Sequence, residues 1–375
     1  MHRNKKILYL FSDTGGGHRA AANALISGVN KVRGKGAPKQ EAVDVFAECS
    51  GFLNIFAKMY GPVTRYYPKM WGTLYYWLDD IKKIENLEKI SRPFIKKELA
   101  NLLERTNPDV IVSVHPMVNH LTIKAMKDIG LKIPMITVIM DPICVHRVWA
   151  CPEVDLFVVA TEAAKKQCME YGIEPKKIKV IGLPIDPRFT EKCKDKEEVR
   201  KEIGLRSKIT TVLLMGGGEG SGNMKKIVSE LNKSNLKIQL IVICGRNKKL
   251  QVELESKVDS FRIPLKIYGF TNHVPEIMCA SDIIISKAGP GAIAEAQAKD
   301  LPMIITSWLP GQEEGNVEFV IKNNIGCVAK EPLKIVASLR FFLEPGILNQ
   351  FKKNILQVKK PFAVFDISKL ILSYL

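Results

Sequence analysis

Long hydrophobic runs are absent from this sequence. The longest apolar stretches, such as Val110–Ile123, are short and contain His and Asn. A helix that crosses a bilayer needs about 20 consecutive apolar residues. The basic start of the chain, residues 1–6, leads into a short apolar stretch and then into glycines, with no small-residue cleavage site. We therefore expect neither a transmembrane helix nor a signal peptide.

Paired cysteines and acidic metal-binding motifs are also missing. Eight cysteines are scattered between Cys49 and Cys327, and no two of them form a C-x-x-C pair. This usage is typical of a reduced, cytosolic protein in which cysteines are small buried hydrophobic residues. No Asp-x-Asp motif occurs, and no glycine loop is followed by the Lys-Ser/Thr pair of a P-loop. We expect no metal cofactor.

Acidic residues are few compared with basic ones. The chain has 39 Asp and Glu against 56 Lys and Arg, which gives a net charge of +17. Nucleic acid, an anionic membrane surface and phosphorylated ligands all fit this charge. The apolar fraction of 46% is that of a globular protein and excludes a mainly disordered chain.

Short apolar runs alternate with helical patterns along the whole chain. Lys6–Phe11 and Thr210–Met215 each lead into a glycine turn and then a helical pattern. The other expected strands are Glu41–Phe46, Val110–Val114, Met135–Met140, Leu156–Ala160, Ile178–Ile181, Gln239–Cys244, Leu265–Tyr268, Asp282–Ser286 and Pro302–Thr306. Continuous apolar strands between helices predict parallel sheets covered on both faces. With a proline-rich boundary near Asp186, we expect an α/β protein of two Rossmann-like domains with a cleft between them.

One segment departs from this alternation. Residues 52–77 contain nine of the chain's 28 aromatic residues, and their only three charges are basic. Residues 82–97 follow with six basic and two acidic residues. Aromatic rings and cations together suit the interface of an anionic membrane, whereas a core helix with a solvated face is the alternative.

The first candidate site is the loop Ser12–Arg19, between an expected strand and an expected helix. Its three glycines allow close backbone approach, and N–H groups at the helix start stabilise an anion. His18 follows them directly, where the helix dipole favours a neutral ring that can act as a base. A capping or surface histidine is the alternative. The spacing also fits a loose dinucleotide fingerprint, with Asp44 as the ribose acid.

Three further loops resemble ligand-binding loops. Gly216–Gly222 has five glycines in seven positions and suits backbone binding of a diphosphate. Ser286–Glu295 also joins a strand to a helix, and Glu295 suits the two hydroxyls of a ribose, or alternatively a cap. Pro310–Asn316 has amide and carboxylate side chains suited to sugar hydroxyls, although a solvated turn has the same composition.

The order of these motifs resembles one family. Asp13–Arg19, Gly216–Gly220, Lys287–Ala296 and Gly311–Asn316 together resemble the monogalactosyldiacylglycerol synthases and the related bacterial processive diacylglycerol glucosyltransferases, of glycosyltransferase family 28. Two shorter segments add to the match, Val145–Trp149 and Gly182–Ile185, so the resemblance covers nearly the whole chain.

The resemblance implies a GT-B fold. The expected parts are an acceptor domain over residues 1–186, a UDP-sugar domain over 187–360, and a helix over 361–375 that crosses back to the first domain. It also implies an inverting transfer of galactose or glucose from a UDP-sugar to the 3-hydroxyl of diacylglycerol. Expected partners are thus UDP-glucose or UDP-galactose, diacylglycerol and an anionic phospholipid surface, but not nucleic acid. The expected location is peripheral, on the cytoplasmic face of a membrane.

The same resemblance implies roles for individual residues. His18 is the expected base, and Asp141 is an acceptor-side carboxylate. Residues expected at the donor are Gly16, Gly17, Gly216, Gly217, Gly218, Glu219, Gly220, Arg246, Gly269, Phe270, Thr271, Lys287, Ala288, Gly289, Pro290, Gly291, Glu295, Gln312 and Glu313. Within this set, Arg246 and residues 269–271 frame the uracil, Glu295 holds the ribose, and Gln312 and Glu313 hold the sugar. Residues expected at the acceptor or membrane are Tyr66, Pro68, Trp71, Trp77, Lys82, Lys83 and His115. His115 and His120 are weaker acceptor-side candidates than Asp141, and structural roles are the alternative for both.

Two positions depart from the family pattern. Met140 stands where members often have Thr, and Asp186 stands where they often have Arg. Arg188, two residues on, is a candidate to replace that arginine. One cationic contact to UDP therefore has no assigned residue.

Other functions remain open from the residues alone. A GT-B transferase acting on another lipid, such as a peptidoglycan precursor, and a UDP-sugar epimerase both share the expected fold. An epimerase needs no aromatic segment. A dinucleotide-dependent oxidoreductase leaves the second and third glycine loops unexplained, and a membrane-binding protein without catalysis needs none of His18, Glu295 and Gln312.

Overall fold

The computed structural model describes residues 5–220 and 222–375, which form two compact units. The first unit comprises described residues up to Pro187 together with Leu309–Gln312 and Phe362–Leu375. The second comprises Arg188–Trp308 and Glu313–Pro361, without the undescribed Ser221 of the second glycine loop. The chain leaves the first unit one residue beyond Asp186, next to the boundary expected from the prolines.

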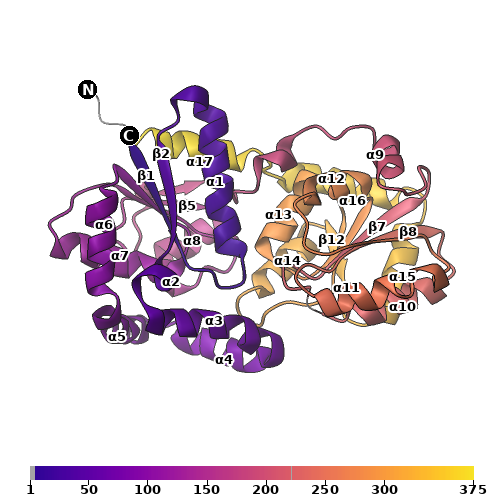
Figure 1. The fold of residues 1–375 in the computed structure, drawn as a ribbon, viewed down its shortest axis with the longest axis horizontal. Coiled ribbons are helices and arrows are strands. Elements are labelled where there is room, and N and C mark those ends of the chain that lie inside the picture. Colours follow the sequence, from indigo (N-terminus) through magenta and orange to yellow (C-terminus); the bar gives the residue numbers. More distant parts are fainter. Residues whose placement is uncertain (1–4, 221) are drawn as a thin grey trace. The chain divides into compact units, whose positions relative to one another are not determined.

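The first unit is a six-stranded parallel sheet in the order β2-β1-β3-β4-β5-β6 (Figure 1). Its strands are β1 (Lys6–Phe11), β2 (Lys39–Asp44), β3 (Val110–Ser113), β4 (Met135–Val138), β5 (Leu156–Val159) and β6 (Ile178–Val180). Its helices are α1 (Gly17–Arg33), α2 (Val45–Cys49), α3 (Gly51–Tyr66), α4 (Pro68–Leu78), α5 (Ile81–Ser91), α6 (Lys96–Thr106), α7 (Pro116–Asp128), α8 (Glu162–Glu170) and α17 (Ala363–Leu372). Every residue of β3, β4 and β5 is buried, as expected for strands covered on both faces.

The second unit repeats this plan in the order β12-β11-β10-β7-β8-β9, again with all strands parallel. Its strands are β7 (Thr210–Met215), β8 (Ile238–Ile243), β9 (Leu265–Tyr268), β10 (Ile283–Ser286), β11 (Met303–Ile305) and β12 (Gly326–Val328). Its helices are α9 (Lys196–Glu202), α10 (Met224–Lys233), α11 (Lys248–Glu255), α12 (Val274–Ala280), α13 (Pro290–Ala298), α14 (Glu314–Lys322), α15 (Pro332–Phe342) and α16 (Ile347–Val358). The predicted α/β architecture of two Rossmann-like sheets is confirmed.

Two local details differ from the sequence-based expectation. Strand β2 begins at Lys39 and ends at Asp44, because Asp44 caps helix α2 by accepting a hydrogen bond from the Ala47 N–H. Phe46 is therefore helical. The edge strand β12 was not expected, since its three residues follow no apolar run, and it forms only by pairing with β11.

The expectation that every cysteine is a lone buried thiol is wrong for two of them. Cys193 and Cys279, 86 residues apart, form a disulfide in the second unit. Cys49, Cys151, Cys168 and Cys244 are buried free thiols, as expected. The disulfide joins the segment before α9 to helix α12, and the sequence offers no C-x-x-C spacing to indicate it.

Helix α17 packs against helix α1 within the first unit (Figure 1). The contact is close because Gly28 of α1 has no side chain. A Cβ added there would lie 2.5 Å from Ser368 Oγ and 2.9 Å from Val364 Cγ2. The glycine thus lets the last helix approach the backbone of the helix that begins at the first glycine loop.

We expect Gly28→Ala to destabilise the protein by about 1–3 kcal/mol, because the added methyl group overpacks the contact between α1 and α17. Urea unfolding measures this loss. Gly28→Ala combined with Ser368→Ala should recover part of it, since the hydroxyl is the nearest obstacle. Gly36→Ala, where no atom lies within 4 Å, is the control. Equal stability of Gly28→Ala and wild type would contradict the proposed packing.

Candidate active site

The catalytic candidates of the first unit lie where its strand order reverses. Strand β1 lies between β2 and β3, so the loops after β1 and β3 leave the same edge of the sheet side by side. This is the position at which open parallel sheets bind ligands. Ser12–Gly16 follows β1 and leads to His18 on the first turn of α1, whereas Val114 and His115 follow β3.

A backbone carbonyl fixes the tautomer of His18. The Nδ1 atom lies 2.5 Å from the carbonyl oxygen of Val114. Because a carbonyl only accepts hydrogen bonds, Nδ1 carries the proton and Nε2 presents a lone pair. The structure therefore gives His18 the form that a general base requires.

The ring of His18 is held neutral. Burial lowers the pKa of His18 to about 4, although the Val114 carbonyl and Asp13 act in the opposite direction. The sequence predicts a neutral ring because of the helix dipole. In the structure the largest cause is burial.

His115 is buried against His18. It is 3% exposed, and its ring centroid is 4.6 Å from that of His18. Its Nε2 lies 3.4 Å from Thr14 Oγ1, which links it to the first glycine loop. The pKa of His115 is lowered well below its usual value by burial and by His18. His115 thus lies beside the residue that was expected to act as the base.

Asp141 is held by a buried tryptophan. The indole Nε1–H of Trp149 donates to Asp141 Oδ2 at 2.6 Å, and Trp149 is 1% exposed. The Trp149 ring centroid lies 6.2 Å from that of His18. The expected acceptor-side carboxylate thus lies in the same part of the unit as the expected base. His120 has a different environment, since its Nδ1 lies 4.0 Å from Glu88.

Asp44 has structural partners that weaken the dinucleotide interpretation. Besides capping α2, its Oδ2 accepts the backbone N–H of Asp13 at 3.2 Å and lies 3.5 Å from Arg19 Nη2. Arg19 Nε also donates to Asp13 at 2.9 Å. These contacts bind the carboxylate into the first glycine loop itself.

The donor candidates of the second unit also lie at a reversal of strand order. Strand β7 lies between β8 and β10, so the loop after β7 and the loop after β10 are neighbours. The pairing of Ser286 with Met215 aligns the next residues, Lys287 and Gly216. The second and third glycine loops therefore meet at one edge, as the sequence motifs predict.

Packing explains one of these glycines. A Cβ on Gly220 would lie 1.9 Å from the Cys244 carbonyl oxygen, so this position accepts no side chain. The positive φ of Gly217, 70°, also favours glycine. Packing alone therefore requires glycine at position 220. Gly218 is less crowded, because the nearest atom to its Cβ position is Arg246 Nη1 at 3.7 Å.

The candidate uracil site combines a cation and an exposed ring. The guanidinium of Arg246 lies 5.1 Å from the ring centroid of Phe270, which is 61% exposed. Arg246 Nη1 also donates to Glu219 at 2.7 Å. Thr271 accepts the His273 N–H, and Arg188 donates to the Asn272 carbonyl at 2.8 Å. Arg188 is thus engaged with this loop.

The loop that was expected to bind the sugar divides between the two units. Gln312, of the first unit, accepts a hydrogen bond from Tyr60 of α3 at 3.1 Å. Glu313, of the second unit, is buried and lies 2.9 Å from Lys287 Nζ. Asn316 donates to the Ala288 carbonyl at 2.9 Å, and Glu295 lies half-buried on α13.

The aromatic segment folds into helices α3 and α4, which are barely covered. Leu53 is the only buried residue of α3, and Gly72 is the only one of α4. Tyr66 is 67% exposed and Trp77 is 55% exposed, while Lys83 lies over the Trp77 ring at 4.4 Å. Pro68 begins α4, and Lys82 is exposed on α5. Trp71 differs, because it packs edge-on against Tyr60 at 4.9 Å.

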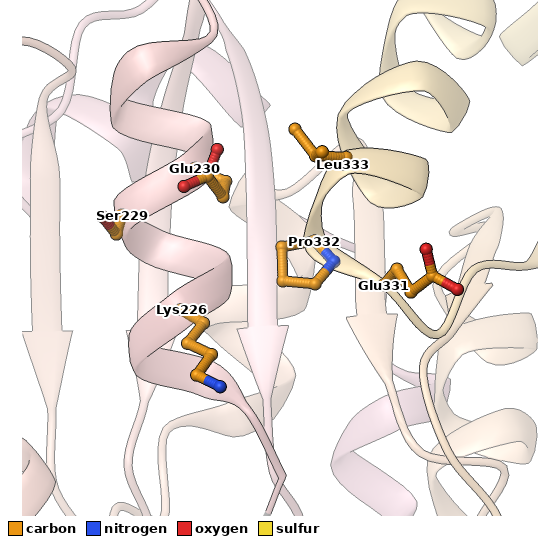
Figure 2. Close-up of a pocket in the computed structure, with 6 residues that line it drawn as sticks. All are labelled: Lys226, Ser229, Glu230, Glu331, Pro332 and Leu333. Carbon is orange, nitrogen blue, oxygen red and sulfur yellow. The ribbon is translucent and has the colours of Figure 1, made fainter.

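A pocket elsewhere in the second unit shares no residue with these loops. It is lined by Lys226, Ser229 and Glu230 of α10 and by Glu331, Pro332 and Leu333 at the start of α15 (Figure 2). No residue expected at the donor, acceptor or base lies in it. Among residues 5–220 and 222–375, no group of three or more His, Cys, Asp or Glu is placed to hold a metal ion.

Comparisons with known proteins identify the family. A family model described as monogalactosyldiacylglycerol (MGDG) synthase matches residues 18–185, and one described as the glycosyltransferase family 28 C-terminal domain matches residues 211–334. The chloroplastic monogalactosyldiacylglycerol synthase of Spinacia oleracea is 36% identical over 97% of this chain and 71% of its own length. The chain belongs to the MGDG synthase family. Synthase 3 of Arabidopsis thaliana is 37% identical over 98% of this chain and 81% of its own length.

Solved structures agree on the fold of this MGDG synthase family member. Acinetobacter baumannii MurG has a TM-score of 0.60 at 12% identity, covering 98% of this chain and 99% of that chain. Anabaena HepE in complex with UDP and glucose has a TM-score of 0.56 at 14% identity, covering 99% and 100%. A UDP-GlcNAc 2-epimerase from Neisseria meningitidis has a TM-score of 0.62 at 13% identity, covering 98% of this chain and 98% of that chain. The chain is a glycosyltransferase with the GT-B fold, and these likenesses concern the fold alone.

We expect the His18 imidazole to titrate near pH 4 rather than near 6.5, because burial disfavours its charged form. Histidine ¹³Cε1 chemical shifts, followed by NMR from pH 8 to well below pH 4, measure this value. The His18→Asn variant assigns the signal. A His18 signal that titrates between pH 6 and 7 would show that the ring is not desolvated as described.

Proposed function

We propose that the chain transfers galactose from UDP-galactose to the 3-hydroxyl of 1,2-diacylglycerol with inversion, forming a β-galactosyl diacylglycerol. The relatives named as monogalactosyldiacylglycerol synthases support the choice of sugar and acceptor. The observation that carries the chemistry is the His18–Val114 hydrogen bond, which directs a neutral Nε2 lone pair away from the carbonyl.

The reaction is a single displacement. The acceptor oxygen forms a bond to the anomeric carbon while the bond from that carbon to the diphosphate oxygen breaks. The hydroxyl proton passes to His18 Nε2, and the electron pair of the broken bond leaves with UDP. Developing negative charge on UDP is stabilised by backbone N–H groups of the loop that follows β7. The proposal includes no metal, in keeping with the absence of an Asp-x-Asp motif.

In the proposed reaction, residues near the glycine loop after β7 bind the UDP part of the donor. Arg246 and Phe270 bind the uracil by stacking and charge, and Glu295 accepts the ribose hydroxyls. Gln312 keeps its amide N–H₂ for a sugar hydroxyl, because Tyr60 donates to the carbonyl oxygen of that amide.

The proposed acceptor side is a membrane surface. We define the aromatic face as the exposed apolar residues of α3 and α4, with Tyr67 between them, namely Phe52, Ile55, Phe56, Met59, Tyr66, Tyr67, Met70, Leu74, Tyr76 and Trp77. Exposed apolar side chains on neighbouring helices are typical of an interaction surface. Rings at headgroup depth and lysines on α5 would hold the protein on an anionic bilayer, where diacylglycerol resides. No helix of the described residues is long and apolar enough to span that bilayer.

Purified protein, diacylglycerol in anionic vesicles and each UDP-sugar in turn test the reaction. We expect a galactolipid from UDP-galactose, little product from UDP-glucose, and no change on adding EDTA. His18→Ala should lower kcat by about 10²–10⁴-fold because the base is lost, while its affinity for UDP is retained. Thin-layer chromatography measures the transfer product, and titration calorimetry with UDP measures the affinity for UDP. If only UDP-glucose gave a product, the assignment of galactose as the transferred sugar would be wrong. Normal turnover by His18→Ala would contradict the assignment of His18 as the base.

We expect Lys82→Gln, Lys89→Gln and Lys97→Gln together to weaken binding to anionic vesicles by about 100-fold, since each lysine near such a surface contributes about 1 kcal/mol. Vesicle sedimentation at low salt measures the loss. The control is Lys226→Gln, Lys237→Gln and Lys322→Gln, which removes the same charge from exposed positions of the second unit. Equal loss in both triple variants would mean that net charge, and not this surface, binds the membrane.

A further inference from the structure

The diphosphate of the donor has no arginine assigned to it. Asp186 stands where the resemblance places an arginine, and Arg188, the candidate replacement, donates to the Asn272 carbonyl. A leaving UDP gains negative charge as the glycosidic bond breaks, and a positioned cation stabilises it more than backbone amides alone.

Lys287 lies between the two glycine loops of the second unit. The register between β10 and β7 sets it beside Gly216. A Cβ added to Gly217 or to Gly289 would lie 3.5 Å from Lys287 Cε. The Lys287 side chain therefore lies close to glycines of both loops. The backbone N–H groups of these loops would bind a diphosphate at the same place.

A buried carboxylate holds the ammonium in this place. Glu313 Oε1 lies 2.9 Å from Lys287 Nζ, and the Glu313 side chain is 5% exposed whereas that of Lys287 is 34% exposed. The carboxylate is thus buried, whereas part of the Lys287 side chain is exposed to solvent. An ammonium has three N–H donors, and one bond to Glu313 leaves others for an anion.

We propose that Lys287 binds the donor diphosphate and stabilises the departing UDP, and that Glu313 positions this ammonium instead of binding the sugar. This inference rests on the proposed function, because it deepens the donor site of that reaction. It assigns the cationic contact that Asp186 cannot make. It also explains why the sequence has an acidic residue at 313, directly beside an amide whose partner is Tyr60.

Titration calorimetry with UDP, UMP and uridine tests the assignment. We expect Lys287→Gln to weaken UDP binding by about 10- to 100-fold while uridine affinity stays unchanged, because only the diphosphate loses a charge-assisted contact. Lys287→Arg should keep part of the affinity. Lys226→Gln, at the pocket of Figure 2, is the matched control and should change neither value. An unchanged ratio of UDP to uridine affinity in Lys287→Gln would overturn the proposal.

Glu313→Gln separates positioning from sugar binding. If Glu313 positions Lys287, the variant should bind UDP and UDP-galactose more weakly by the same factor. If Glu313 binds the sugar, only the affinity for UDP-galactose should fall, and this result would overturn the positioning role. Lys287→Gln with Glu313→Gln replaces both charges by amides, so that no buried carboxylate is left unpaired if the single variant unfolds. Nucleotide binding needs no acceptor lipid. Failure of transfer to diacylglycerol by wild type would therefore refute the proposed function without altering this measurement.

Discussion

The hydrogen bond between His18 and the Val114 carbonyl is the contact on which the proposed chemistry of the first unit depends. It exists because β1 and β3 are neighbours in a parallel sheet, so that a helix start and a strand end meet at one edge. One acceptor-only partner selects the tautomer, and burial of the ring keeps it neutral. The second unit uses the same reversal of strand order to bring a lysine beside a glycine loop. Sheet topology thus assembles both sets of polar groups from residues far apart in sequence.

Local patterns were sufficient to predict most of the sheets and the position of His18 at the start of a helix. Strands β1, β7 and β9 have the predicted bounds, because each is an apolar run with clear turn residues after it. His18 could be chosen as a site candidate from the sequence because the strand, the glycine turn and the helix that position it are consecutive in the chain. The family resemblance added an order of motifs that no single loop carries.

Contacts between distant residues could not be predicted in the same way. The partner of Glu313 is Lys287, and nothing in either loop alone indicates that the carboxylate is buried next to that ammonium. His115 was expected only on the acceptor side, and its burial against His18 depends on the pairing of β3 with β1. The Cys193–Cys279 disulfide and strand β12 likewise depend on tertiary neighbours. These polar groups become buried only when the sheets are assembled. Secondary-structure propensity and motif spacing therefore do not predict their burial.

Helix α17 has a consequence for the order in which the molecule is made. The helix that seals one side of α1 is encoded after the whole second unit, so the first unit consists of segments separated in the chain. During synthesis the sheet of β1 to β6 emerges early, but the surface around Gly28 stays open until residue 372 has left the ribosome. The nascent first unit must therefore wait, partly uncovered, while the second folds. Helix α1 thus gains its contact with α17 only after the second unit has been synthesised.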